Sequence, residues 1–266
     1  MFTDISPYCC EWLTNLFDDK IICCDIRELS SKDCESRSHF FAGIGGWELA
    51  LQLSGWQGPV WTGSCPCQPF SKAGKQLGVK DERHLWPKFY ELIDECRPPA
   101  IFGEQVATNL GFEWFARVRS DLENSGYAVG AADLCAASVG APHIRQRLFW
   151  GAVDPSRLDN TCCVGSQVGR AEQATSVLER GSRLSSFTRS DTVVGRDSRY
   201  RRIESGVLPL AHRLSHKVGR MFTGDRKLQL RAARTNKNAR LTAYGGTIVL
   251  PVAATFILAM MESLAQ

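Results

Sequence analysis

His39-Phe-Phe-Ala-Gly-Ile-Gly-Gly46 is a short apolar run that ends in closely spaced glycines, and Trp47 to Leu53 follows it with helical periodicity up to Gly55. The pattern predicts a buried strand, a turn and a helix. Glycines at such a turn let the backbone approach a ligand at the helix start, or simply let two elements pack closely. Because the spacing differs from the full dinucleotide-binding fingerprint, the identity of a ligand stays open at this point.

The alternation of strand and helix patterns continues on both sides of this turn. The predicted helices cover residues 8–17, 47–53, 85–95, 114–124 and 251–264, and the predicted strands cover residues 20–25, 60–64, 100–103, 127–134 and 147–153. Such alternation predicts an α/β fold with a doubly wound sheet, whose functional groups lie at the carboxyl ends of the strands. After Asp154 the regular pattern is expected to fade until the last helix.

Composition narrows the class of protein. The chain has 266 residues, of which 44% are hydrophobic and 23% charged, so a disordered or collagen-like chain is excluded. The start, MFTDISPYCC, has no secretory pattern, and the longest apolar stretch, residues 246–261, contains Pro251 and is short for a membrane span. We therefore expect a cytoplasmic protein without membrane contact, whose eleven cysteines are reduced thiols.

Charge is distributed unevenly along the chain. Residues 156–245 hold 18 Lys and Arg against 7 Asp and Glu, a charge of +11, which leaves −7 for the rest. An Arg-rich segment joined to an acidic, more apolar body predicts a surface that meets phosphates. A solvated or partly disordered insertion is the alternative.

Two polar groups stand at predicted strand ends. Cys67, in Pro66-Cys67-Gln68, lies in a glycine- and lysine-rich loop, where a thiolate nucleophile would be exposed and activated. Glu104 follows the next strand. Taken alone, an ordinary partly buried cysteine and a helix-capping carboxylate explain these residues equally well. The cysteine spacing does not fit a zinc site, so we expect no metal.

Five segments in order, FAGIGG, GSCPCQPFSKAG, GEQV, APHIRQR and YGGTIVLPVAA, resemble the motifs of the cytosine-5 DNA methyltransferases. The resemblance covers most of residues 39–153 and 240–264. It implies a Rossmann-like sheet that binds S-adenosylmethionine, and methyl transfer to the fifth carbon of a cytosine flipped out of double-stranded DNA. The compact size is similar to the phage or prophage branch of that family, in which such enzymes protect DNA from restriction.

The resemblance implies four catalytic residues. Cys67 matches the family's nucleophile, which adds to the sixth carbon of the ring because the fifth carbon is itself a poor nucleophile. Glu104 matches the glutamate that holds or protonates N3 of the base. Arg145 and Arg147 match the two arginines of the QxRxR motif, in which His143 replaces the leading glutamine.

The resemblance also implies a cofactor site. Its first group of residues is Phe41, Ala42, Gly43, Ile44, Gly45, Gly46, Pro66 and Thr247, with Phe41 expected near the adenine. Thr247 ends Gly245-Gly246-Thr247, where the family has GN[AS]. The expected amide side chain is missing there, which leaves weaker cofactor binding open.

Two cofactor segments of the usual family order are missing between Gly46 and Pro66, which are only 20 residues apart. Similar segments stand at the N-terminus instead: Asp4 and Ile5 for the ribose and the adenine face, and Asp25 for the adenine amino group. We therefore expect a permuted strand order in which the second and third strands come first. A broken, inactive relic and an accidental short match are the alternatives.

The resemblance divides the chain into a catalytic and cofactor-binding domain, residues 1–155 plus 244–266, and a small, irregular, basic target-recognition region, residues 156–243. Double-stranded DNA is the expected partner of a monomer. The residues expected to contact nucleic acid are Gln68, Ser71, Lys72, Arg199, Arg201, Arg202, Arg234 and Arg240. An inactive DNA-binding protein, methylation of RNA and transfer of another one-carbon group stay open.

Overall fold

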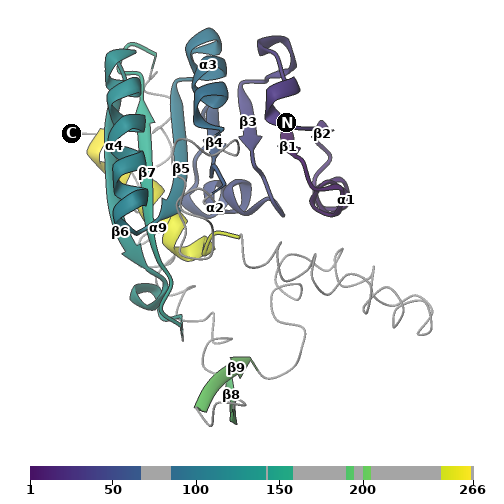
Figure 1. Cartoon of the computed structure of the whole chain (residues 1–266), viewed down its shortest axis with the longest axis vertical. Coiled ribbons are helices and arrows are strands. Elements are labelled where there is room, and N and C mark those ends of the chain that lie inside the picture. Colours follow the sequence, from purple (N-terminus) through teal and green to yellow (C-terminus); the bar gives the residue numbers. More distant parts are fainter. Residues whose placement is uncertain (67–84, 142, 158–189, 195–199, 205–246, 265–266) are drawn as a thin grey trace.

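The structure is a computed structural model that describes residues 1–66, 85–141, 143–157, 190–194, 200–204 and 247–264. Its main feature is a seven-stranded sheet in the spatial order β2-β1-β3-β4-β5-β7-β6 (Figure 1). Strands β1 to β5 run parallel to one another, whereas β7 is antiparallel to both β5 and β6. The strands are β1 (Phe2–Asp4), β2 (Ile21–Cys23), β3 (Arg37–Phe40), β4 (Val60–Gly63), β5 (Ala100–Val106), β6 (Ala128–Cys135) and β7 (Gln146–Val153).

Helices connect these strands and begin and end at recognisable residues. The α-helices are α1 (Pro7–Leu16), α2 (Gly46–Ser54), α3 (Trp86–Cys96), α4 (Asn109–Asn124) and α9 (Leu250–Leu264), and the short 3-10 helices are η1 (Ile26–Glu28), η2 (Ser31–Asp33) and η4 (Ala136–Val139). Ser6 caps α1, with Pro7 as its first residue. Gly55 ends α2 in the left-handed conformation, as its position in the sequence predicts.

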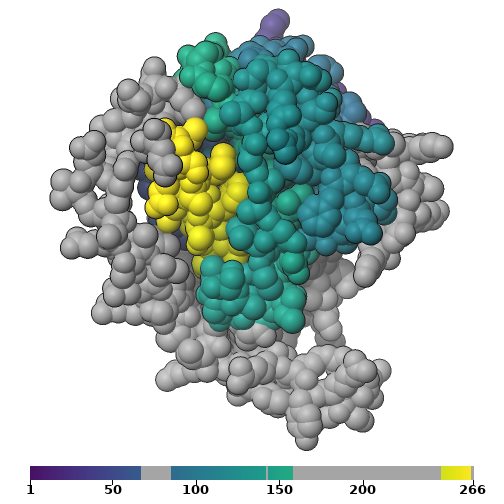
Figure 2. Space-filling model, turned by 90° about the vertical axis from the view of Figure 1, so that its left-hand side faces the viewer, coloured from purple at the N-terminus to yellow at the C-terminus, as the bar shows by residue number. Residues whose placement is uncertain are grey.

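Two hydrophobic clusters cover opposite faces of the sheet, because neighbouring strand residues point to opposite sides. Val60 and Phe102 pack with α2 and α9, whereas Trp61 and Ile101 pack with α3 and α4. In the space-filling view, α9 (yellow) lies directly against the teal part of the chain, which ends at residue 157 (Figure 2). The sheet is therefore covered on both sides, as predicted for a doubly wound fold.

The connections on either side of β4 differ in hand. The steps β3–α2–β4 and β4–α3–β5 move in the same direction across a parallel sheet. Right-handed crossovers, which form about 98% of such connections, would place both helices on one face. Because α2 and α3 lie on opposite faces, one of the two crossovers is left-handed.

Most predicted elements are confirmed with shifts of one or two residues at their ends, but three expectations are wrong. Helix α4 starts at Asn109 rather than Trp114, because Thr108 caps it by accepting a hydrogen bond from Gly111 N. Glu104 lies inside β5, two residues before its end. Regular structure also returns before the last helix, as the antiparallel pair β8 (Ser190–Val194) and β9 (Tyr200–Glu204).

The described residues contain neither a membrane-spanning helix nor a cluster of metal-binding side chains. No helix in this part of the chain combines the length and the apolar character that a membrane crossing requires. Nor do three or more metal-binding side chains gather there.

Candidate active site

The glycine turn after β3 is built on the N-terminal strand. Ala42 N donates to Thr3 O (3.0 Å), and Gly43 N donates to Asp4 Oδ2 (2.8 Å). Phe41 and Gly43 have positive φ values of 52° and 55°. A side chain added to Gly43 would meet nothing within 4 Å, so the turn faces open space on that side. The structure thus brings Asp4 and the glycine turn together, although 39 residues separate Asp4 from Gly43.

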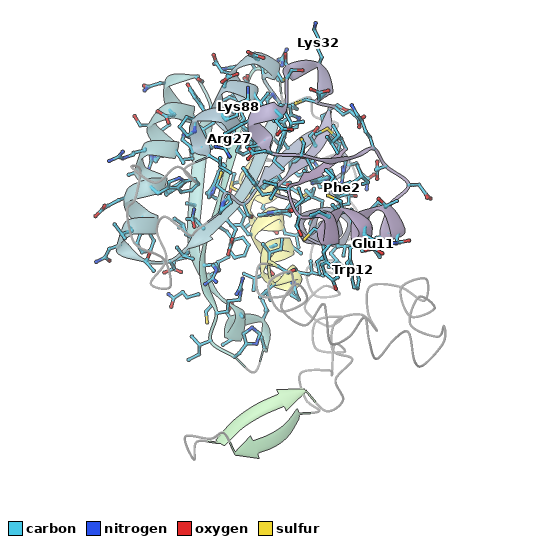
Figure 3. All side chains as sticks on the ribbon, turned by 45° about the vertical axis from the view of Figure 1, so that its right-hand side comes forward. Phe2, Glu11, Trp12, Arg27, Lys32 and Lys88 are labelled. Atoms are coloured by element: carbon cyan, nitrogen blue, oxygen red, sulfur yellow. The ribbon has the colours of Figure 1, made fainter. Side chains whose placement is uncertain are left out.

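Gly45, the N-cap of α2, fixes how α1 approaches the turn. Its φ is +82°, and an added Cβ would lie 2.4 Å from the Phe17 ring. Phe17 in turn stacks on Phe2 with a centroid distance of 4.5 Å, and Phe2 is labelled in Figure 3. Close packing therefore explains Gly45, whereas open space in front of Gly43 leaves room for a ligand.

Ile5 and Asp25, the other predicted cofactor residues of the N-terminal segment, have different surroundings. Ile5 follows Asp4 and is 67% exposed, which leaves an apolar side chain free to pack on a flat ligand. Asp25 follows β2, caps η1 and forms an ion pair with Arg27 (2.6 Å; Arg27 is labelled in Figure 3). Hydrogen bonds from Arg27 lower the pKa of Asp25, so this carboxylate stays ionised and able to accept a further hydrogen bond.

The C-terminal segment closes the same end of the sheet. Gly46 is so close to this segment that an added Cβ would lie 3.0 Å from Ile248 Cγ1 and 3.4 Å from Thr247 Cγ2. Thr247 O accepts a hydrogen bond from Arg145 Nη2 (3.2 Å). Thr247 therefore lies between the glycine turn and Arg145.

Glu104 is a buried carboxyl beside two arginines. Arg147 Nε lies 2.7 Å from Glu104 Oε1, an ion pair in which the N–H direction does not meet hydrogen-bond geometry. Burial raises the pKa of Glu104, and the charges of Arg147 and Arg145 oppose that rise. A carboxyl in this state can carry a proton at a pH where an exposed glutamate has lost it, which suits a hydrogen-bond donor to a ring nitrogen.

The approach to Cys67 is described up to Pro66. Ser64 and Cys65 follow β4, and Ser64 Oγ accepts a hydrogen bond from Trp47 Nε1 (2.9 Å). Cys65 is 5% exposed, and burial raises the pKa of its thiol, which therefore stays protonated and unreactive. Burial therefore argues against Cys65 as the nucleophile, and the role of Cys67 stays a prediction.

Several predicted residues cannot be placed. The predicted site residues outside the described part of the chain are Cys67, Gln68, Ser71, Lys72, Arg199, Arg234 and Arg240. Arg201 and Arg202 belong to β9, where they pair in register with Val193 and Thr192 of β8. Their roles stay predictions.

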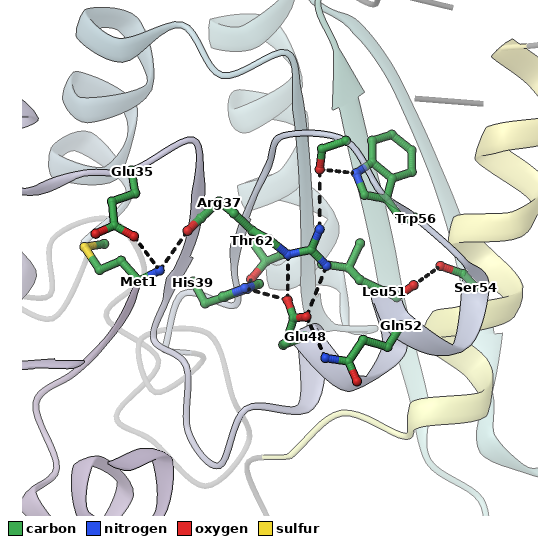
Figure 4. A network of polar contacts seen from close by, with 11 residues as sticks. Met1, Glu35, Arg37, His39, Glu48, Leu51, Gln52, Ser54, Trp56 and Thr62 are labelled. Atoms are coloured by element: carbon green, nitrogen blue, oxygen red, sulfur yellow. Dashed lines mark hydrogen bonds and ion pairs between the residues drawn. The ribbon is translucent and has the colours of Figure 1, made fainter. Parts of the chain in front are cut away.

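A buried polar network behind the glycine turn was missed by the sequence reasoning (Figure 4). Glu48 of α2 accepts two hydrogen bonds from Arg37 (2.8 and 3.2 Å), and His39 Nε2 lies 3.0 Å from Glu48 Oε2. Burial lowers the pKa of His39, so its ring is neutral, with Nε2–H donating to Glu48 and Nδ1 accepting from Thr62 Oγ1. The sequence signal for this network was His39, a polar residue at the start of the apolar run that leads to the glycines.

A comparison with protein-family models identifies the family of this chain. Residues 2–176 match the family model described as C-5 cytosine-specific DNA methylase. The chain therefore belongs to this family, and its seven-stranded mixed sheet is the α/β methyltransferase fold that the resemblance predicts.

Relatives and solved structures match parts of the chain. The Type II methyltransferase M.NgoMIV of Neisseria gonorrhoeae is 39% identical over 94 residues, which cover 34% of this chain and 30% of the relative. M.AluI of Cellulosimicrobium cellulans is 35% identical over 113 residues, which cover 37% and 22%. These matches thus span less than a third of the length of either relative.

Among solved structures, S. pombe Dnmt2 methyltransferase matches with a TM-score of 0.40 and 23% identity, over 57% of this chain and 42% of that one. A putative DNA modification methyltransferase encoded within an E. coli prophage matches with a TM-score of 0.40 and 17% identity, over 60% and 42%.

Proposed function

We propose that this chain transfers a methyl group from S-adenosylmethionine to the fifth carbon of cytosine in double-stranded DNA. Family membership supports the reaction type, and one observation carries the assignment to this chain. A buried carboxyl with a raised pKa, Glu104, stands beside Arg147 and Arg145, and Arg145 reaches the segment that packs on Gly46. The group that would hold the base is thus joined through Thr247 to the turn that would hold the cofactor.

The residues around the glycine turn fit the cofactor. Gly43 faces open space, the Asp4 carboxylate is fixed beside it, and Ile5 exposes an apolar surface. Asp4 would bind the ribose hydroxyls, Ile5 and Phe41 would pack near the adenine, and Asp25 would accept from its amino group. When bound, S-adenosylmethionine supplies an electrophilic methyl group.

The chain's own residues account for the rest of the chemistry. The Cys67 thiolate adds to the sixth carbon of the ring, and the electron pair that moves toward N3 is neutralised by the Glu104 proton. The fifth carbon thereby becomes nucleophilic enough to accept a methyl group. After methyl transfer, Glu104 recovers its proton from N3, water takes the proton from the fifth carbon, and expulsion of the thiolate restores the ring. Arg147 would hold the Glu104 carboxyl in place throughout.

The positive charge of residues 156–245 supports nucleic acid as the substrate, because arginines neutralise phosphates. Base flipping follows from the same proposal, since a paired cytosine cannot reach a thiolate. Monomeric state, cytoplasmic location and the division at residues 156 and 243 stay predictions.

The test is incubation of the protein with isotopically labelled S-adenosylmethionine and either mixed-sequence duplex DNA or RNA, followed by mass analysis of nucleosides. We expect 5-methylcytosine in the DNA and none in Cys67→Ala, which should still bind the cofactor. Cys23→Ala, which changes an exposed cysteine on β2, is the matched control and should keep activity. Product on RNA alone would contradict the proposal that DNA is the substrate. A base mass shift other than one methyl would contradict the proposal that the transferred group is methyl. No product from a protein that binds DNA tightly would favour an inactive binder.

A further inference from the structure

We propose that Trp47 is a positioning residue for the nucleophile, acting through its hydrogen bond to Ser64. The inference rests on the proposed function, because it concerns how the Cys67 thiolate is aimed. Trp47 is the second residue of α2 and directly follows the glycine turn. Its indole Nε1–H donates to Ser64 Oγ over 2.9 Å, and Ser64 precedes Cys67 by three residues in the sequence.

The ring of Trp47 is held firmly enough to act as an anchor. The side chain is 4% exposed and lies between Phe102 of β5 and Phe149 of β7, at centroid distances of 6.3 and 6.1 Å. Phe102 precedes Glu104 by two residues, and Phe149 is the register partner of Glu104. One ring therefore touches the strands that carry the catalytic carboxyl and the arginine beside it.

The stem, residues 64–66, follows β4 and leads to Cys67 in the sequence. Cys65 is buried and fixes one residue of the stem by packing, and Pro66 restricts its own backbone. The Ser64 hydroxyl is fixed by the indole N–H, so the stem is held from the side of the glycine turn. The same helix thus relates the turn that would hold the methyl donor to the stem that leads to the nucleophile.

Positioning of this kind affects rate more than binding. A displacement of about 1 Å between reacting groups can cost about 100-fold in rate, although the affinity for each ligand is kept. A hydrogen bond between an indole and a hydroxyl has the directionality to prevent such a displacement. Phenylalanine at position 47 would keep an aromatic ring between Phe102 and Phe149 but would lose the donor.

The experiment compares Trp47→Phe, Ser64→Ala, their double variant and Ser64→Thr. Single-turnover methylation and cofactor affinity are measured for each. We expect Trp47→Phe and Ser64→Ala each to lower the single-turnover rate about 10- to 100-fold, with cofactor Kd changed less than about threefold. The double variant should be no slower than either single variant, because both remove the same interaction. Ser64→Thr should keep a rate close to that of the wild type, since it retains the hydroxyl.

Trp56→Phe is the matched control. Trp56 is also buried against Phe102, and its indole donates to Gly58 O (3.0 Å), away from the stem. Trp56→Phe should lower thermal stability about as much as Trp47→Phe and leave the rate near that of the wild type. Equal rates in the two variants, or additive losses in the double variant, would overturn the inference. If the wild type makes no 5-methylcytosine, the proposed function itself fails, which is a distinguishable result.

Discussion

Glu104 shows at the scale of one residue how location in a sheet sets chemistry. The side chain belongs to a strand with every residue buried, so solvent cannot stabilise its charge. Arg147, on the neighbouring strand, limits the resulting rise in pKa without abolishing it. The carboxyl is therefore both held in place and inclined to keep a proton.

Glu104→Gln should separate these two properties. The amide fits the same space and can donate a hydrogen bond to N3, but it cannot transfer a proton. Because the pKa of Glu104 is raised, the protonated form persists to a higher pH than in an exposed glutamate and is lost as the pH rises through the folded-state value. We expect a rate about 100-fold lower in Glu104→Gln, DNA affinity close to that of the wild type, and loss of the alkaline decline that Glu104 causes. A variant with wild-type rate at every pH would show that Glu104 is not the proton donor.

At the scale of elements, helix α2 has a left-handed glycine at each end, which gives a matched pair. Gly45 precedes the helix at φ +82°, and an added Cβ would lie 2.4 Å from the Phe17 ring. Gly55 follows the helix at φ +77°, and an added Cβ would meet nothing within 4 Å. Both positions therefore require a left-handed backbone, but only Gly45 is packed against another side chain.

Gly45→Ala and Gly55→Ala should therefore differ in their effect on the free energy of unfolding. Gly55→Ala carries the conformational term alone, about 1–2 kcal/mol. Gly45→Ala adds overpacking against Phe17, a further loss of about 1–3 kcal/mol. Denaturant unfolding measures both values. Equal losses would mean that α1 does not press on the glycine turn.

The network of Arg37, His39 and Glu48 joins β3 to α2 and makes stability depend on pH (Figure 4). Burial alone would raise the pKa of Glu48, but hydrogen bonds from His39, Arg37 and Gln52 outweigh it and lower the pKa to about 2. The stabilisation is thus complete above the unfolded-state value near 4.5 and is lost as the pH falls toward about 2.

Glu48→Gln should lower the free energy of unfolding by about 2 kcal/mol at neutral pH. It should also flatten the decline of stability with acid, because the ionisable partner is gone. Glu11→Gln, a change at an exposed position of α1 that Figure 3 labels, is the control and should alter neither quantity. A variant with the steep acid dependence of the wild type would show that another carboxyl causes it.

The sequence predicts those elements that depend on neighbouring residues, and it does not predict contacts between residues far apart in the chain. The strands and helices around Gly43 and Gly55 follow from local periodicity and from glycine punctuation, which are properties of neighbouring residues. The Thr108 cap was missed because Asn109 and Gly111 are poor helix formers. The bond between Trp47 and Ser64 and the partners of Glu48 depend on long-range packing, which one sequence does not display. Motif resemblance assigned Glu104 and Arg147, and the structure shows them paired.

At the scale of the whole molecule, the hand of the crossovers supports a permuted strand order, which stays a prediction. A right-handed crossover from β3 to β1 would place its helix on the face opposite to that of a right-handed crossover from β3 to β4. If the β4–α3–β5 crossover has the usual right hand, α2 occupies the face that a connection from β3 to β1 requires. A helix that once led to β1 and now leads to β4 would keep that face.

Removal of residues 1–30 tests the contribution of the relocated segment. The truncated chain would lack β1, which lies between β2 and β3, and Asp4, which binds Gly43 N. We expect loss of cofactor binding, together with lower thermal stability, because the glycine turn loses its support. Calorimetric titration with S-adenosylmethionine is the measurement. A folded product with undiminished cofactor affinity would show that residues 1–30 do not form part of the site.

The most direct test of the central claim is covalent trapping on duplex DNA that contains 5-fluorocytosine, in the presence of S-adenosylmethionine. Fluorine at the fifth carbon cannot leave as a proton does, so a thiolate that has added to the ring stays bonded to it after methyl transfer. We predict a protein–DNA adduct whose peptide mass maps to Cys67, and no adduct in Cys67→Ala. Methylation of ordinary DNA without any adduct, or an adduct at another cysteine, would contradict the proposed mechanism.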